Sequence, residues 1–214
     1  MRIANLSGHQ LCEYWSLLED VQVDRGQRPD ETLVLRDARG PLHIPNPSAL
    51  LREAVRRMTL GAVSLRNLLP SFPSYSDPPE SVSDQARGLL RDLDQLSGVI
   101  ARSLAMCAAL ELRLIPLNRG ARLAPWTLPG CRSARLAPSA VTRHRKDHAE
   151  LVCQGSGYRA EFRGDEAVRL LEQLNRGETD GGSVLPEPVL AYLYAAGLLV
   201  CGAPRSCTDS CRPT

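Results

Sequence analysis

Two proline-rich stretches divide the chain more firmly than any other feature of its sequence. Residues 70–79, PSFPSYSDPP, and residues 116–138 hold prolines that fix φ and remove backbone donors, so neither stretch can form a continuous helix. We therefore predict a mainly helical amino-terminal domain with a short hairpin over 1–115, a proline-rich connection over 116–138 and a compact module over 139–203. The last residues, 204–214, are predicted to form a flexible polar tail.

The amino-terminal domain is expected to consist mostly of helices. Apolar side chains recur every three or four residues over 9–20, which predicts a short helix. Residues 32–44 predict two short strands around a glycine-containing turn. A helix is predicted over 46–58, with Asn46 as its N-cap and proline at its first position. The same apolar periodicity predicts one long helix over 83–116.

The module over 139–203 has a different, more compact pattern. Three short strands are predicted at Ala140–Arg143, Glu150–Cys153 and Tyr158–Phe162, the last two joined by a glycine-rich turn. A helix follows over 165–174, and a second helix over 186–197 is closed by glycine and a short strand. The order β-β-β-α-α-β is typical of a winged-helix-like module, and the fold class predicted for the whole chain is α+β.

Composition limits the partners of the protein. The 214 residues include 26 basic and 24 acidic side chains, so a net charge of +2 gives no overall field that gathers nucleic acid or anionic lipid. The longest apolar stretch, Val189–Val200, is shorter than the roughly 20 residues of a membrane-spanning helix. The amino terminus lacks the apolar core of a signal peptide, so we expect a cytoplasmic protein with no membrane partner. Seven irregularly spaced cysteines favour reduced thiols.

The residues that most often carry chemistry do not form a recognisable motif. His144 and His148 are four apart, but their segment has no apolar face and no HExxH arrangement, which favours a solvated turn. The glycines at 155–157 precede a strand rather than a helix, which favours a hairpin turn over a phosphate-binding loop. The G-x-S-x-G pattern of a nucleophile elbow is missing. We therefore predict no catalytic and no metal-binding residue.

Peptide binding is the function that the module favours. The exposed edge of a small sheet next to an apolar helix can accept a peptide as an added strand. The residues predicted to contact it lie on the last hairpin strand and the closing helix: Tyr158, Arg159, Phe162, Tyr192 and Tyr194. Because side chains alternate along a strand, Arg159 and Phe162 cannot both face the same way as Tyr158. The alternative is that about half of these residues belong to the core.

Two other classes of function remain open. The arginine-rich segment 132–146 beside a small α/β module could neutralise phosphates, as in a winged-helix DNA-binding regulator. The helix expected to read bases is almost wholly apolar over 189–195, which disfavours nucleic acid as a partner. A thiol-dependent or metal enzyme could instead use the carboxy-terminal cysteines Cys201, Cys207 and Cys211, although their spacing lacks paired metal-binding knuckles.

Several segments together resemble a known family over about residues 40–200. They are IPNPSALLREAVRRMTLGAVSLRNLL, ALELRLIPLNRGARL, the strands within 135–152, YRAEFRGDEAVRLLEQL and YLYAAGLLV. In this order they resemble the amino-terminal, non-catalytic region of SagB-like azoline dehydrogenases, which act on thiazole- and oxazole-containing ribosomal peptides. Residues 139–200 are also similar to PqqD-like recognition elements that bind leader peptides, although RGETDGGSV is too short for the middle helix of a complete element.

The resemblance implies a role without catalysis by this chain alone. In that family the region precedes a flavin-binding nitroreductase domain, and no Arg-x-Ser-x-Arg-like segment of its FMN site occurs in this sequence. The expected function is therefore a non-catalytic subunit or scaffold in ribosomal peptide maturation. Its expected partners are a precursor (leader) peptide and a flavin-dependent dehydrogenase or cyclodehydratase subunit. No cofactor is expected on this chain, and FMN would come with a nitroreductase-type partner.

Overall fold

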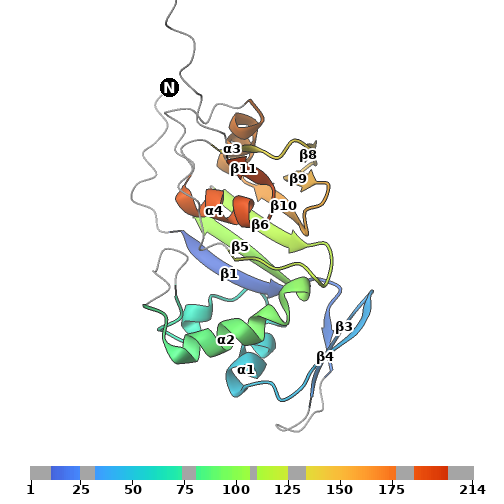
Figure 1. The fold of residues 1–214 in the computed structure, drawn as a ribbon, viewed down its shortest axis with the longest axis vertical. Helices are drawn as coiled ribbons and strands as arrows, with labels where there is room; N and C mark the ends of the chain where they lie inside the picture. Colours follow the sequence, from blue (N-terminus) through green and yellow to red (C-terminus); the bar gives the residue numbers. More distant parts are fainter. Residues whose placement is uncertain are drawn as a thin grey trace, which may run out of the picture.

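The computed structural model describes residues 11–24, 32–73, 81–106, 110–124, 134–176 and 186–201. Within these residues the fold is α+β and is built around one antiparallel sheet of six strands (Figure 1). In spatial order the strands are β1 (Cys12–Leu17), β5 (Ile100–Met106), β6 (Leu110–Pro116), β10 (Tyr158–Arg163), β9 (Ala149–Cys153) and β8 (Ala140–His144). The sheet thus joins strands from both sides of the 116–138 connection.

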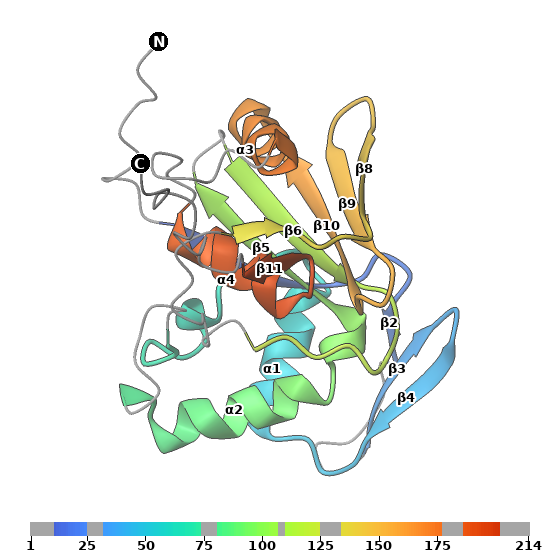
Figure 2. The same ribbon diagram turned by 45° about the horizontal axis from the view of Figure 1, so that its top comes forward.

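Helices and smaller sheets pack around this central sheet. The α-helices of the described residues are α1 (Ala49–Met58), α2 (Asp84–Asp94), α3 (Asp165–Arg176) and α4 (Glu187–Ala195). One small sheet contains β2 (Gln22–Val23), β3 (Leu33–Asp37) and β4 (Gly40–Ile44), and another pairs β7 (Ala134–Leu136) with β11 (Leu199–Cys201). Figure 2 shows α3 and α4 beside the β6–β10 part of the sheet, while α1 and α2 lie together away from them.

The two faces of the central sheet have different characters. Residues directly opposite each other in an antiparallel ladder point to the same face. One face carries Trp15, Leu112, Leu114, Ala160 and Phe162, which are buried in the two apolar clusters beneath the helices. The other face carries a polar row that crosses the sheet in register: Tyr14, Ser103, Arg113, Glu161, Glu150 and Arg143. Covering one face and leaving the other polar is common in antiparallel sheets.

Two helices expected in the amino-terminal domain are wrong. The described part of 9–20, residues 11–20, does not form a helix, because Cys12–Leu17 is strand β1, paired with β5 and burying Trp15 and Leu17. The long helix over 83–116 is also wrong: α2 ends at Asp94, and the chain continues as strands β5 and β6. Apolar residues four apart fit the period of a strand as well as that of a helix, so the spacing alone could not separate them.

Gly98 lies where the expected long helix breaks. An ideal Cβ at Gly98 would be 2.4 Å from the Cα of Arg119, a distance that no side-chain carbon can occupy. Glycine therefore permits the close approach of these two backbone segments. The side chain of Arg39 also donates a hydrogen bond to the Gly98 carbonyl at 2.8 Å, which holds this turn against the β3–β4 hairpin.

Other expected elements are confirmed with small shifts. The hairpin over 32–44 is β3 and β4, turned at Gly40 with φ +104°, a conformation that favours glycine. The helix over 46–58 ends at Met58 as expected, but its N-cap is Ser48, whose side chain accepts from the Leu51 N–H at 3.1 Å. The predicted cap, Asn46, lies before the helix with φ +49°.

The module has the predicted order of elements: β8, β9, β10, α3, α4 and β11. Its strands do not form a separate sheet, because β10 pairs with β6 of the amino-terminal region and β11 pairs with β7. Gly155 adopts φ +86° in the turn between β9 and β10, as a tight hairpin turn requires. No helix among the described residues is both long enough and apolar enough to cross a membrane.

Candidate functional site

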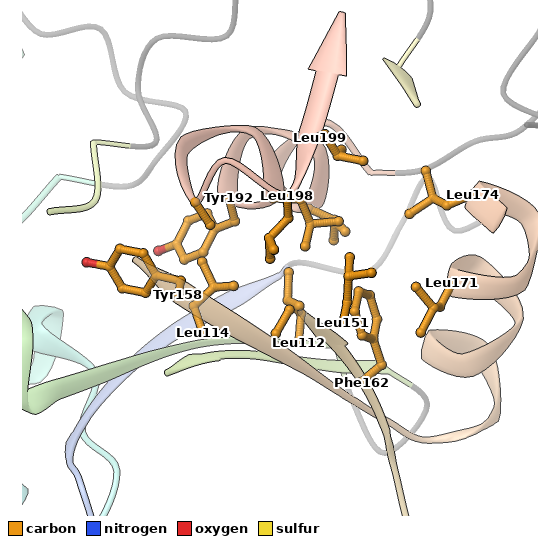
Figure 3. Close-up of a cluster of buried hydrophobic side chains, with 14 of the residues drawn as sticks. Leu112, Leu114, Leu151, Tyr158, Phe162, Leu171, Leu174, Tyr192, Leu198 and Leu199 are labelled. Carbon is orange, nitrogen blue, oxygen red and sulfur yellow. The ribbon is translucent and has the colours of Figure 1, made fainter. Parts of the chain in front are cut away.

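The five residues predicted to contact a peptide do not share one surface. Tyr158, Phe162 and Tyr192 are at most 4% exposed and belong to the core under α4 (Figure 3). Tyr194 is 36% exposed, and Arg159 is partly exposed on the opposite face of the sheet. The structure therefore brings together Tyr158 and Tyr192, whose rings lie close in Figure 3, but as packing residues rather than as a binding surface.

The edge expected to receive a peptide also lies elsewhere. Strand β10, which carries three of the predicted contacts, is flanked by β6 on one side and β9 on the other. Its backbone hydrogen-bonding groups are therefore already engaged, and no strand can add to it. Strand β8 is at the end of the sheet, and among the described residues no strand pairs with its outer edge. The candidate edge for strand addition is thus β8.

The register identifies which backbone groups of β8 face outward. The N–H of Arg145 donates to the His148 carbonyl at 2.8 Å, so these two residues form a hydrogen-bonded pair at the turn. Hydrogen-bonded and non-hydrogen-bonded pairs alternate along an antiparallel ladder. The next pair therefore directs the N–H and C=O of His144 away from β9, and the same holds for Thr142 two residues earlier. These groups form the free edge.

The side chains around this edge give it a mixed chemical character. Val141 is 53% exposed and Arg143 is also exposed, and both point to the polar face of the sheet. Thr142 points to the helical face, where its hydroxyl donates to the Asn175 side chain at 3.1 Å. At the start of β8, the N–H of Ala140 donates to the Ala137 carbonyl at 2.8 Å. This N–H is therefore not available to an added strand.

A second arrangement lies where β9 and β10 adjoin, on the polar face. His148, Glu150 and Glu161 each offer one ligand atom, and these atoms all lie within 4.8 Å of one another. Glu150 and Glu161 are directly opposite across the two strands, and the Nε2 of His148 is 3.5 Å from Oε1 of Glu150. The His148 ring is held by Asp147, whose Oδ1 is 2.8 Å from Nδ1. We call these three ligand residues the open cluster.

Arginines surround the carboxylates of the open cluster. Arg145 lies 3.2 Å from Oε2 of Glu150, and Arg159 lies 3.3 Å from Oε1 of Glu161. Burial opposes ionisation of Glu150, but the neighbouring His148 ring and Arg145 guanidinium outweigh it and hold the pKa of this carboxyl below its usual value. The arginines thus offset part of the repulsion expected between two acidic side chains directly opposite each other.

A third arrangement, the closed cluster, consists of Glu13, Arg102 and Tyr192. The guanidinium of Arg102 donates to Oε1 of Glu13 at 2.6 Å and to the Tyr192 hydroxyl at 3.1 Å, and the hydroxyl in turn donates to Glu13. The guanidinium of Arg102 also lies over Trp15, with Cζ 4.1 Å from the ring centroid. Burial raises the pKa of Tyr192 well above its ordinary value.

A small cavity of about 210 Å³ borders the closed cluster. Trp15, Arg102 and Tyr158 contribute to its wall, together with residues of α2. Burial raises the pKa of Tyr158 to about 12, so its phenol stays protonated at neutral pH. The Arg102 guanidinium in its wall is already engaged by Glu13 and Tyr192, and the Asp94 carboxylate is 3.3 Å from Arg122.

The sequence contained a signal for the open cluster that helical spacing concealed. The helical spacing of His144 and His148 is not the relevant one, because His148 and Glu150 are two residues apart along a strand. Residues two apart share a strand face. The third member, Glu161, is found only through the β9–β10 register.

The remaining chemical candidates receive no support from the described residues. The side chains of Val189, Tyr192 and Leu193 on α4 are buried, so this helix offers no polar face to base edges. The tail cysteines Cys207 and Cys211 lie outside the described residues, and the flexible tail predicted over 204–214 does too. No protein-family model matches the chain, and no curated protein matches it either.

Proposed function

We propose that this protein is a non-catalytic peptide-binding subunit or scaffold in the maturation of a ribosomally made, modified peptide. The observation that carries the proposal is the outer edge of β8, where Thr142 and His144 direct backbone donors and acceptors away from the sheet. An extended precursor peptide would add there as a further antiparallel or parallel strand. Main-chain hydrogen bonds would supply the affinity, and the side chains next to the edge would supply the selectivity.

The chemistry beside the edge favours a peptide with an acidic and an apolar residue two positions apart, so that both side chains lie on the polar face. On the polar face, Arg143 would attract a carboxylate and exposed Val141 would contact an apolar side chain. Exposed Arg145 and Lys146 in the adjoining turn add positive charge near one end of the edge. The same charges repel a second copy of this edge, which is how natural edge strands avoid pairing with themselves.

The maturation context of the proposal rests on the segments that resemble the amino-terminal region of SagB-like azoline dehydrogenases. In that context the protein would present its peptide to a flavin-dependent dehydrogenase or cyclodehydratase subunit, and the FMN would belong to that partner. The element order β8 to β11 is consistent with a winged-helix-like recognition module. Binding a peptide at β8 rather than β10 is the change that the sheet order imposes on the original expectation.

Two substitutions of Thr142 test the edge directly. Thr142→Ala and Thr142→Pro both lose the hydroxyl that bonds Asn175, but only proline also removes the outward N–H. Because that N–H does not pair with β9, proline is tolerated at this edge position. Peptides selected from a displayed random library on the wild-type protein would be measured by fluorescence anisotropy. We expect the alanine variant to bind nearly normally and the proline variant about tenfold more weakly.

Charge reversal tests the selectivity. Arg143→Glu should weaken binding of the acidic peptides, whereas Arg91→Glu, an equal change of charge on the exposed side of α2, should not. Failure to enrich any peptide, or equal binding to the Thr142→Pro variant, would overturn the proposal. Tight binding of duplex DNA with a steep salt dependence would instead support the winged-helix regulator.

A further inference from the structure

We propose that the open cluster, His148, Glu150 and Glu161, is a binding site for a divalent first-row transition-metal ion of the Zn²⁺ or Mn²⁺ kind. This inference does not depend on the proposed peptide binding, because the cluster is on the polar face of β9 and β10 rather than at the β8 edge. The donors are one imidazole and two carboxylates, a mixture of ligands found in protein sites for these metals.

The fold places the three ligands together by register and not by chance proximity of flexible side chains. His148 immediately precedes β9 and lies two residues before Glu150, so both are directed to one face. Glu161 is the cross-strand partner of Glu150 in the β9–β10 ladder. Metal–ligand bonds of about 2.0–2.2 Å separate neighbouring ligand atoms by about 3.0–3.5 Å, so a closing movement of about 1 Å within the 4.8 Å cluster completes the site.

Atoms that face the cluster lack hydrogen-bond partners. Both Nε2 of His148 and Oε2 of Glu161 are buried and have no hydrogen-bond partner among the described residues. The Glu161 side chain is only 7% exposed, and Arg163 lies 3.6 Å from Oε2, beyond hydrogen-bonding distance. A buried carboxylate oxygen without a donor is unfavourable, and a metal ion at this point would satisfy it.

Asp147 supplies the support that a metal-binding histidine usually has. Its Oδ1 is 2.8 Å from Nδ1 of His148, so when His148 binds a metal ion through Nε2, its Nδ1–H can donate to Asp147. This carboxylate–histidine–metal arrangement fixes both the tautomer and the orientation of the ring. Asp147 is a positioning residue here, because it contacts the histidine and not the ion.

The neighbouring arginines set the strength of the site. Arg145 engages Oε2 of Glu150, and Arg159 engages Oε1 of Glu161. Each glutamate therefore has one oxygen held by an arginine, while Oε1 of Glu150 and Oε2 of Glu161 adjoin His148 and Arg163 respectively. The arginines repel a cation, so removal of one of them should strengthen metal binding. Loss of an arginine should therefore raise the metal affinity, whereas loss of a ligand residue should lower it.

The first experiment uses Mn²⁺ on the full-length, isotope-labelled protein in reducing buffer. Mn²⁺ prefers carboxylate and imidazole to thiolate ligands, which keeps the cysteines from dominating the result. Its unpaired electrons broaden nearby amide signals, so the NMR spectrum locates the bound ion. We expect broadening centred on residues 148–150 and 161, and a Zn²⁺ titration by calorimetry in which binding at this site is weakened by loss of Glu161 or Asp147.

Four variants separate a metal site from an ion-pair network. Glu161→Gln should weaken metal binding by roughly ten- to a hundredfold, and Asp147→Asn by about tenfold. Glu172→Gln, the same change on an exposed part of α3, should leave it unchanged. Arg163→Gln should tighten it, a gain that a misfolded protein cannot imitate. Broadening only outside the cluster, or equal affinity of the wild-type, Glu161→Gln and Arg163→Gln proteins, would overturn the proposal.

Discussion

The closed cluster and the open cluster contain similar side chains but differ in how fully their polar atoms are hydrogen-bonded. Each contains buried carboxylate oxygens next to a guanidinium, and each is attached to the central sheet. In the closed cluster Arg102 and Glu13 are 8% and 11% exposed and bond each other and Tyr192. In the open cluster the arginines on Glu161 are about 40% exposed, and Oε2 of Glu161 has no hydrogen-bond partner among the described residues.

The difference follows from what covers each face of the sheet. Helix α4 lies over the closed cluster and contributes the Tyr192 hydroxyl, so the buried charges are satisfied within the protein. On the polar face, Glu161 pairs with Arg159 and Arg163, whose side chains are themselves about 40% exposed. A saturated buried network stabilises one arrangement of the fold, whereas an unsaturated one retains donor atoms for a ligand. The comparison therefore supports a structural role for the closed cluster and the binding role proposed for the open cluster.

The largest expected effect comes from removing the same side chain in each cluster. Glu13→Ala leaves the buried Arg102 guanidinium without its carboxylate and should lower the free energy of unfolding by about 3–5 kcal/mol. Glu161→Ala leaves Arg159 and Arg163, which can turn to water, and should cost no more than about 1 kcal/mol. Urea unfolding of both variants in buffer with a chelator measures the difference. Equal losses would remove the distinction between the clusters.

The closed cluster could not be predicted from sequence. Glu13 and Arg102 are 89 residues apart, and both were assigned to helices on the strength of apolar spacing. Strand β1 is defined by its pairing with β5, a long-range interaction that leaves little trace in a local pattern. Ile100 and Leu104 are four apart, which matches both a helix face and alternate positions of a strand.

The module was predicted far better, because its elements are local. Strands β8, β9 and β10 follow one another through short turns, and glycine at 155 is a direct signal for the second turn. Strand β10 is internal because it pairs with β6, which precedes the 116–138 connection, so the edge of the sheet could not be identified from the module alone. The order of elements in the module could thus be predicted from sequence, but its exposed strand edge could not.

The second-largest loss of stability is expected on removal of the hydroxyl that α4 contributes to the closed cluster. Tyr192→Phe keeps the ring in the core but removes the hydroxyl that bonds Arg102 and Glu13. The free energy of unfolding should fall by about 1–2 kcal/mol, because a buried hydrogen bond to charged groups is lost with little change of volume. The control is Tyr194→Phe on the exposed side of the same helix, which should have almost no effect. An equal loss in both variants would show that α4 does not complete the cluster.

The smallest effect is expected at Asp37, a carboxylate intermediate between the two clusters. It tests whether burial of a carboxylate or its pairing with arginines has the larger effect on stability. Asp37 is covered, with ion pairs to Arg39 at 2.6 Å and Arg119 at 2.5 Å, but these arginines are 32% and 26% exposed. Burial opposes its ionisation, yet hydrogen bonds from Arg119 and Arg39 outweigh it and lower its pKa. Asp37→Asn should therefore cost no more than about 1 kcal/mol at neutral pH.

The pH dependence of the stability lost in Asp37→Asn shows whether folding lowers or raises the pKa of Asp37. A carboxyl whose pKa is lowered by folding stabilises the protein above the unfolded value of about 3.9, and the stabilisation is lost as the pH falls toward the folded value. The stability difference between wild type and Asp37→Asn should therefore be constant from neutral pH to about pH 5 and shrink below about pH 4, as measured by urea unfolding. A difference that grows on acidification would mean that Asp37 is stabilised as the neutral acid, and that covering a carboxylate matters more here than supplying its partners.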